Sequence, residues 1–204
     1  MGVRERKERE RAAARQAALE VAVRLLEAGG PQAVTVRAIA QELEYSTTVV
    51  YTLFGGMQGV WDALYLEGMR RLGEGVAAVP RSGDAPHDLR AVCRAYRRAA
   101  ADSAAFYPLL FARPVPGYRP SDEAIAGGQG GLAPLVRVLA AGIQDGSFVS
   151  ADLALTAETV WAALHGAVSL ELDRRVLGPE HAEARFERLL ELLLRGLRAE
   201  TTAS

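Results

Sequence analysis

The sequence predicts an all-α protein, and three observations support this prediction. Half of the 204 residues are apolar, which is enough to bury a sizeable core. Aromatic residues make up only 6%, while alanine and leucine are abundant, a composition that favours packed helices over sheets. Apolar residues recur at helical spacing, whereas an alternation of apolar and polar residues never persists long enough to indicate a strand.

The first three predicted helices lie close together at the N-terminus. Apolar residues at helical spacing predict a helix over about residues 9–28, which the Gly-Gly-Pro run at 29–31 terminates. Thr35 then takes the N-cap position of a second, short helix. A third helix starts after Ser46 and ends before Gly55. Two short helices joined by a tight turn are the layout of a helix-turn-helix.

The rest of the chain predicts further helices separated by loops rich in glycine and proline. The segment VPRSGDAP at 79–86 is the clearest break, and GGQGG at 127–131 damages the start of a later helix. In chain order, the remaining helices are predicted over about 57–78, 87–101, 103–112, 132–143, 151–176 and 180–199.

Charge and composition exclude several classes of protein. With a net charge of −1, a nucleic-acid-binding surface would have to be local. The single cysteine, Cys93, excludes an intramolecular disulfide and a cysteine-rich zinc site; it is either a packed core residue or a redox sensor. The charged N-terminus lacks the pattern of a secretory signal, and no stretch approaches the ~18 uninterrupted apolar residues that span a bilayer. We therefore expect a soluble, cytoplasmic protein with no membrane segment.

No arrangement of residues indicates catalysis, a cofactor or a metal. Nucleophile–base pairs and phosphate-binding loops do not occur at a useful spacing. The glycines of GGQGG follow no predicted strand, so they are not a dinucleotide-binding fingerprint. His87, His165 and His181 show no metal-ligand spacing. We expect no enzyme activity.

The segment TVRAIAQELEYSTTVVYTLFGGMQGVWDAL, residues 35–64, resembles the DNA-binding segment of the tetracycline-repressor (TetR) family. The matching positions are Thr35-Val36, Ile39-Ala40, Ser46, and Tyr51 with Phe54. The resemblance implies a helix-turn-helix DNA-binding domain over residues 1–56. It also implies a larger helical domain for effector binding and dimerisation over residues 57–204.

Two positions depart from the family pattern. The family's turn usually reads Ala-Gly-Val-Ser, whereas this chain has Leu-Glu-Tyr-Ser at 43–46. Glu44 must therefore adopt a backbone conformation that glycine adopts cheaply, or the turn must be reshaped. Met57 stands where the family usually has a lysine that contacts a phosphate. The departure at Met57 predicts weaker or differently anchored DNA binding without loss of the fold.

The third predicted helix is a candidate recognition helix. Such a helix enters the major groove with its N-terminus first, so Thr47 and Thr48 can reach base edges. Tyr51 can reach a phosphate through its hydroxyl, a role that the resemblance also implies. Ser46 is expected mainly to cap the helix. The alternative is that these side chains only cap and pack.

Two residues of the preceding helix are candidates for phosphate contact. Thr35 can offer its hydroxyl and its backbone N–H at a helix N-terminus. Arg37 lies beside Thr35 on the outward side of the same helix. The alternative for Thr35 is a role as a cap alone.

The segment VWAALHGAVSLEL, residues 160–172, carries a second resemblance. Its Trp-x-x-x-His-Gly pattern is similar to that of a TetR subfamily, and aromatic residues gather elsewhere in the middle of the chain. Together they can wall a cavity for a small apolar or weakly polar effector, or they can be plain core. The predicted ligand-binding residues are Tyr96, Tyr107, Phe111, Trp161 and His165.

The last two predicted helices carry more apolar surface than a terminal helix usually buries alone. One has a stripe of small residues, and the other has a stripe formed by Phe186, Leu189, Leu190, Leu193 and Leu197. Paired with a second subunit they would form a four-helix interface, as the resemblance implies, and a two-fold dimer suits a palindromic site in double-stranded DNA. The sequence favours a ligand-responsive regulator, most simply a repressor. The alternatives are a helical dimerisation module without specific DNA binding and an all-α enzyme.

Overall fold

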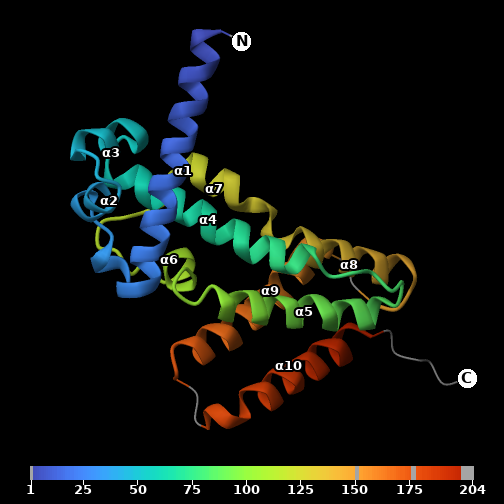
Figure 1. Cartoon of the computed structure of the whole chain (residues 1–204). Coiled ribbons are helices and arrows are strands. Elements are labelled where there is room, and N and C mark those ends of the chain that lie inside the picture. Colours follow the sequence, from blue (N-terminus) through green and yellow to red (C-terminus); the bar gives the residue numbers. More distant parts are fainter. Residues whose placement is uncertain (1, 150–151, 176–177, 199–204) are drawn as a thin grey trace, which may run out of the picture. The chain divides into compact units, whose positions relative to one another are not determined.

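The computed structural model describes residues 2–149, 152–175 and 178–198, and the regular structure of these residues is helical (Figure 1). The α-helices are α1 (Val3–Gly29), α2 (Val36–Glu42), α3 (Thr47–Phe54), α4 (Met57–Ala77), α5 (Ala85–Asp102), α6 (Tyr107–Phe111), α7 (Asp122–Gly128), α8 (Ala133–Gln144), α9 (Leu153–Leu172) and α10 (Ala182–Leu197). Short 3-10 turns, η1 to η3, cover Pro31–Ala33, Gln129–Leu132 and Pro179–His181. Within the described residues there is no strand, so the all-α prediction is confirmed.

Two predicted helices differ clearly from the observed ones, whereas the broken entry predicted at GGQGG before the helix at about 132–143 is confirmed. The helix expected from about residue 9 begins at Val3, because Arg–Glu pairs four residues apart, such as Arg4 with Glu8 at 3.1 Å, support the exposed first turns. The helix expected over 103–112 is confined to Tyr107–Phe111. The GGQGG run is accommodated by the end of α7 and the turn η2. The predicted ends at 151, 176 and 199 lie outside the described residues.

The chain divides into two compact units. The first consists of Met1–Arg70 with Ser103–Gln129, and the second of Arg71–Asp102 with Gly130–Ser204. The division falls within α4, so this helix contributes to both units. The functional boundary at residues 56 and 57 stays a prediction, because compactness and function need not divide a chain at the same place.

The core of the first unit is built from the apolar faces of α1, α2 and α3 and from the start of α4. Val21, Ile39, Val50 and Val60, one from each of these helices, are at most 1% exposed. Phe106, from the segment after α5, is completely buried in the same core. The three N-terminal helices are thus held by one continuous apolar cluster, which fixes α3 against α1 and α2.

The segment between α6 and α7 is attached to α4 through Asp62. Asp62 Oδ1 accepts hydrogen bonds from the Tyr118 hydroxyl (3.1 Å) and from the backbone N–H of Ser121 (3.2 Å). The Tyr118 ring lies 6.1 Å from that of Trp61. Burial, together with the Asp62 carboxylate, raises the pKa of Tyr118, so its hydroxyl stays a proton donor. Asp62 therefore joins residues 118–121 to the first unit.

In the second unit α5 packs against α8, α9 and α10. The turn that leads into α5 is closed by Asp88. Its Oδ1 accepts hydrogen bonds from the N–H and hydroxyl of Ser82 (2.8 and 2.6 Å), and its Oδ2 accepts one from the N–H of Gly83 (3.3 Å). After α8, the Phe148 ring occupies the space that a Cβ on Gly142 would need, so this position requires glycine.

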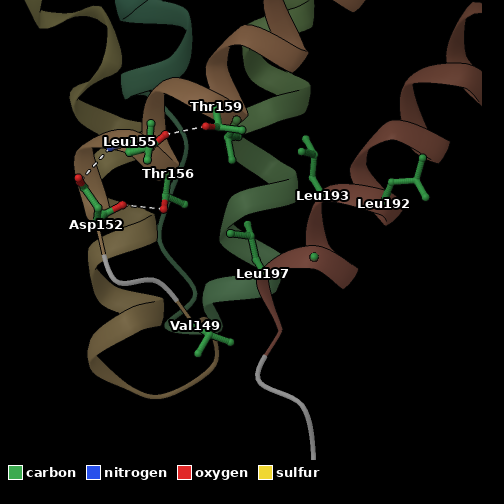
Figure 2. Close-up of a pocket in the computed structure, with 10 residues that line it drawn as sticks. Val149, Asp152, Leu155, Thr156, Thr159, Leu192, Leu193 and Leu197 are labelled. Carbon is green, nitrogen blue, oxygen red and sulfur yellow. Dashed lines mark hydrogen bonds between the residues drawn. The ribbon is translucent and has the colours of Figure 1, made fainter.

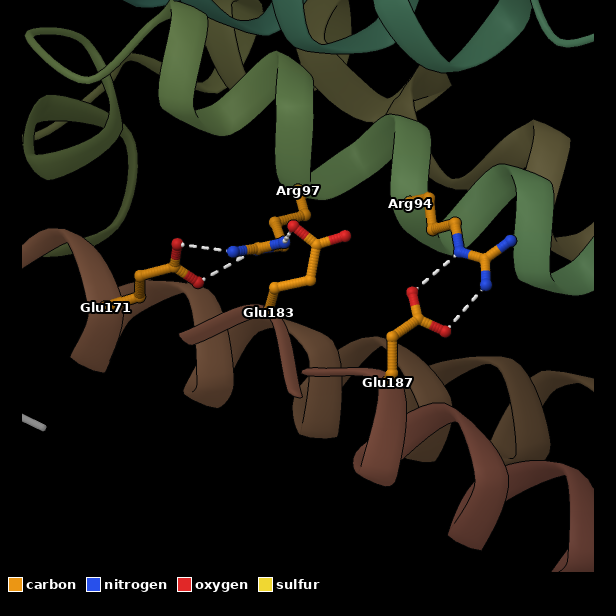
Figure 3. A network of polar contacts seen from close by, with 5 residues as sticks. All are labelled: Arg94, Arg97, Glu171, Glu183 and Glu187. Carbon is orange, nitrogen blue, oxygen red and sulfur yellow. Dashed lines mark hydrogen bonds and ion pairs between the residues drawn. The ribbon is translucent and has the colours of Figure 1, made fainter. Parts of the chain in front are cut away.

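Two bidentate ion pairs connect α5 to the last two helices (Figure 3). Arg94 donates to Glu187 of α10 at 2.7 and 2.6 Å, and Arg97 donates to Glu171 of α9 at 2.9 Å through both of its bonding nitrogens. Glu183 lies 3.9 Å from Arg97. The Glu187 pair raises the pKa of Arg94, and Arg94 in turn lowers the pKa of Glu187. Bidentate geometry makes these pairs more specific than single surface contacts.

Candidate nucleic-acid interface and effector domain

The turn between α2 and α3 has a defined geometry. Thr35 caps α2, since its hydroxyl oxygen accepts a hydrogen bond from the backbone N–H of Ala38 at 3.1 Å. Glu44 has a φ of 56° in the left-handed region, so it takes the conformation of the glycine that it replaces. The N–H of Tyr45 then donates to the carbonyl of Ala40 at 2.9 Å. The backbone of the turn thus accommodates Glu44 in the left-handed conformation.

The helix α3 exposes one face and buries the other. Val50 and Leu53 are buried, whereas Thr47, Thr48 and Tyr51 are exposed, Tyr51 to 55%. Thr52 lies on the same exposed face. Hydroxyl groups therefore dominate the outward surface of α3.

Ser46 occupies the N-cap position of α3, but its side chain makes no capping hydrogen bond. The expectation that Ser46 mainly caps the recognition helix is therefore wrong in this detail, although the exposed hydroxyl keeps it a candidate for DNA contact. At the other end, Gly55 with a φ of 75° terminates α3 in the left-handed conformation.

Two arginines of α1 hold the C-terminal half of α3. Arg11 donates from Nη2 to the carbonyl of Thr52 at 3.1 Å, and the guanidinium of Arg15 lies 4.9 Å from the centroid of the Phe54 ring. The sequence predicts no role for Arg15, and for Arg11, within the charged N-terminal arm, it leaves open a solvated helix face or a phosphate contact. Their spacing of four residues, which places both on one face of a helix, was the available signal.

The charged groups near this surface are few. Arg37 is exposed in the first turn of α2, as predicted. Glu44 is also exposed, and Met57 is half-buried and packs against the core of the unit. Met57 thus contributes to packing at the position where a lysine would reach a phosphate.

The predicted ligand-binding residues fall into both units. In the first unit Tyr107 and Phe111 form a tilted pair with ring centroids 4.9 Å apart. In the second unit Trp161 stacks on His165 with centroids 5.4 Å apart, while Tyr96 is buried. Burial lowers the pKa of His165, so its imidazole is neutral at pH 7. The structure brings these residues together as two aromatic pairs, and the assignment of all five to one ligand stays a prediction.

A groove of about 510 Å³ lies between α9 and α10 in the second unit (Figure 2). Its lining includes Leu155, Thr156 and Thr159 from α9, Leu192, Leu193 and Leu197 from α10, and Val149 and Asp152 before α9. The hydroxyls of Thr156 and Thr159 donate to the backbone carbonyls of Asp152 (2.7 Å) and Leu155 (2.8 Å). Since those hydroxyls are already bonded within the helix, the groove is less polar than its residue types suggest.

The same two helices expose large apolar side chains. Leu155 is 61% exposed, Leu170 47% and Leu192 53%. The predicted leucine stripe is only partly available, because Phe186, Leu190 and Leu197 are buried within the chain. Leu192, which the sequence analysis did not include in the stripe, is the most exposed large apolar residue of α10; exposure is not readable from helical spacing alone.

Two segments satisfy the length and hydropathy of a membrane span, Asp122–Gln144 and Leu153–Leu172. Meeting these criteria is weak evidence for a membrane span, because core helices of soluble proteins meet them too. The turn η2 interrupts the first segment at Gln129–Leu132. In the second, which is α9, only 22% of the apolar window is buried within the chain.

Cys93 is buried on α5, and burial, with a contribution from the nearby Glu187, raises the pKa of its thiol to about 12. A protonated, inaccessible thiol favours the packing interpretation over redox sensing. Within residues 2–149, 152–175 and 178–198, no group of three or more histidine, cysteine, aspartate or glutamate side chains is arranged to hold a metal ion.

Three helices share a buried core, and the last of them, α3, follows a tight turn and has one exposed face. This arrangement defines a helix-turn-helix DNA-binding protein. Residues 18–64 match a family model described as "Bacterial regulatory proteins, tetR family". Residues 89–193 match a second model, "Tetracyclin repressor-like, C-terminal domain". The chain belongs to the TetR family of transcription regulators. No curated protein matches it.

Solved structures of similar proteins agree with this assignment. The candidate regulatory protein SCO4313 is 28% identical over 92% of this chain and 98% of its own, with a TM-score of 0.77. The TetR family regulator PfmR from Thermus thermophilus is 23% identical over 89% of this chain and 96% of its own, with a TM-score of 0.63. RolR, solved with the ligand resorcinol, is 16% identical over 94% of this chain and 91% of its own, with a TM-score of 0.64. The last two comparisons concern the fold alone.

Proposed function

We propose that the protein is a homodimeric repressor that binds a palindromic operator and releases it when a small molecule binds. The observation that carries this proposal is the exposed face of α3, where Thr47, Thr48 and Tyr51 lie on a helix that a buried core holds in place. A transcription regulator needs a rigid element whose polar groups are free to meet DNA. The outward face of α3 meets this requirement.

The proposed contacts follow from where each group lies. Thr47 and Thr48 are in the first turn of α3 and contact base edges, because a recognition helix enters the groove with that end first. Tyr51 lies one turn later and donates its hydroxyl to a phosphate. Thr35 and Arg37 contact a second phosphate from the N-terminus of α2, where unpaired backbone N–H groups favour an anion.

The proposed dimer uses α9 and α10. Their exposed leucines leave apolar surface that a second copy would cover. Two glycines support the same conclusion: among the described residues, nothing lies within 4 Å of where a Cβ would stand on Gly166 or Gly196. Glycine inside a helix costs about 1 kcal/mol relative to alanine. Packing within the chain does not explain that cost, whereas close approach of a partner helix does.

The proposed effector is small and apolar or weakly polar. Trp161 and His165 offer a stacked aromatic pair whose neutral imidazole has one donor and one acceptor nitrogen, with Nε2 lying 3.5 Å from the Ser169 hydroxyl. Tyr107 and Phe111 offer a second pair. The resorcinol bound to RolR is of the same chemical class. We include Tyr96 because its hydroxyl is the polar group of a buried side chain on α5.

The test is a gel-shift titration with the promoter region that flanks the gene for this protein. We expect a complex in the nanomolar range that resists an excess of random DNA. A Thr47→Ala/Thr48→Ala double variant should keep weak binding to random DNA and lose the preference for the promoter. Small weakly polar compounds, screened against the complex, should include one that dissociates it.

One specific observation keeps a second candidate in view. Glu44 places a carboxylate beside the proposed DNA surface, and Met57 removes a phosphate contact, as a helical dimerisation module without specific DNA binding would allow. Equal affinity of the wild-type protein for the promoter and for random DNA, or no binding to either, would support that module and reject the repressor.

A further inference from the structure

We propose that the operator is read mainly through thymine methyl groups, so that each half-site presents A·T base pairs to Thr47 and Thr48. This inference rests on the proposed function, and it specifies the class of DNA sequence that the site accepts. It follows from which side chains are present on the exposed surface of the helix-turn-helix and from the contacts that they already make.

The stretch from Leu43 to Gly56, which covers the turn and all of α3, contains no arginine, lysine, histidine, asparagine or glutamine. Arginine and lysine are the side chains that make bidentate hydrogen bonds to guanine, and asparagine and glutamine make them to adenine. The proposed recognition helix therefore has none of the strong base readers. Apart from the exposed Glu44 carboxylate, which can accept a hydrogen bond from a cytosine amino group, specificity comes from single hydroxyls and from apolar contact.

A threonine side chain supplies both a hydroxyl and an apolar methyl group. Within the described residues, the side-chain hydroxyls of Thr47 and Thr48 take part in no hydrogen bond, and both residues are exposed. The hydroxyl of Thr52 donates to the carbonyl of Thr48 at 2.9 Å, which leaves its methyl group as the part that can meet another molecule. A hydroxyl can pair with any base, whereas a methyl group packs specifically against the C5-methyl of thymine.

The neighbouring arginines are engaged elsewhere. Arg11 is bonded to the carbonyl of Thr52 and Arg15 lies over Phe54, so both lie at the C-terminal half of α3 rather than at the end that enters the groove. Arg24 pairs with Glu42 at 3.3 Å. Arg37 is exposed at the start of α2, where the proposed function assigns it to a phosphate. A bidentate, guanine-directed contact from arginine or lysine therefore has no donor at the N-terminal end of α3.

The experiment begins by selecting tight-binding sites for the full-length protein from a library of random duplex DNA. We expect the enriched half-site to contain thymines in a central A·T run. Each thymine is then replaced by deoxyuridine, which removes only the methyl group and keeps the pairing. Burying one methyl group contributes ~0.8 kcal/mol, so we expect about a fourfold loss of affinity at a contacted thymine. Replacement in both half-sites should give about a fifteenfold loss.

Variants then identify which side chain meets the methyl group. Thr47→Ser and Thr48→Ser keep the hydroxyl and remove the methyl, so in one of them the uracil effect should vanish. Thr48→Val is the matched control, since it replaces the hydroxyl with a second methyl group and keeps the first; the uracil effect at the thymine that Thr48 contacts should persist. Double-mutant cycles of this kind separate a direct contact from a change in DNA flexibility.

The outcomes are distinguishable. Uracil sensitivity that disappears with one serine variant supports the inference. Selected sites that centre on guanine, insensitivity to uracil at every thymine, or sensitivity that both serine variants retain would overturn it and leave the proposed regulator standing. If no sequence is enriched at all, the proposed function itself is rejected, and the inference with it.

Discussion

Leu192→Glu tests the proposed dimer at its most exposed apolar residue on α10. Leu192 is 53% exposed and is one of the residues that line the groove of Figure 2, as is Leu155, which is 61% exposed. Burying a leucine side chain completely contributes ~2 kcal/mol, so covering the exposed half contributes about 1 kcal/mol per subunit. A two-fold axis repeats each contact, and the substitution removes about 2 kcal/mol of association free energy. Two carboxylates brought into the interface add a further penalty.

The predicted loss of apolar contact alone raises the dimer dissociation constant about 30-fold, and the charge raises it further. Sedimentation equilibrium over a range of concentrations measures this constant, and operator affinity should fall with it because the two half-sites are bound jointly. Leu192→Ala is the matched control, which removes the contact without adding charge. Circular dichroism should show the wild-type helix content, since Leu192 is largely outside the core of its own chain. A Leu192→Glu protein that dimerises like the wild type would refute the assignment of this face.

Three further substitutions test separate parts of the protein. Tyr51→Phe should weaken binding to all DNA sequences alike by about 1 kcal/mol, since a phosphate contact is blind to the bases; an altered sequence preference in binding selections would contradict this role. For Asp88, burial raises the pKa of the carboxyl, but the hydrogen bonds from Ser82 and Gly83 outweigh it and hold the pKa below its ordinary value. Its contribution to stability is therefore present above the pKa of the unfolded chain, about 3.9, and is lost as the pH falls through the lower folded value. Asp88→Asn should thus lower the free energy of unfolding at pH 7 by about 1 kcal/mol, with the difference from wild type shrinking towards pH 2 in urea titrations; a difference independent of pH would reject this account. Trp161→Ala should change the response to effector while operator affinity without effector stays within a few fold, and a large fall in melting temperature with loss of both activities would instead assign Trp161 to the core.

The helix-turn-helix was predictable because its signals are local. Thr35 caps α2 as its position before an apolar run indicated, and the glycine pair at 55 and 56 ends α3. At Glu44 the sequence left open either a left-handed residue or a reshaped turn, and the observed φ of 56° corresponds to the first of these. These features depend on the backbone of a few neighbouring residues.

Features that depend on distant contacts were not predictable in the same way. The spacing of leucines in α10 shows which residues share a stripe. It does not show that Phe186 and Leu190 are buried in the chain's own core while Leu192 stays exposed. Likewise, no local pattern indicates that Tyr118 binds Asp62, some 56 positions earlier, and so joins the first unit. Such contacts are decided by the packing of whole helices, which the periodicity of one helix does not determine.

We propose that the switch acts along the covalent chain that joins the two units. The chain passes between them after Arg70, Asp102 and Gln129. The first of these passages lies inside α4, whose backbone hydrogen bonds continue across it, whereas Asp102 is the end of α5 and Gln129 begins a 3-10 turn. We therefore expect α4 to carry the coupling between effector and operator, since a continuous helix transmits a displacement that a turn absorbs.

In the first unit α4 is anchored by the hydrogen bond from Tyr118 to Asp62, so Tyr118→Phe should reduce the coupling while leaving each separate affinity within a few fold. Linkage requires the effector to weaken operator binding by the same factor by which operator DNA weakens effector binding. Calorimetric titrations in both orders measure the two factors, and a Tyr118→Phe protein with the wild-type factor would exclude this route.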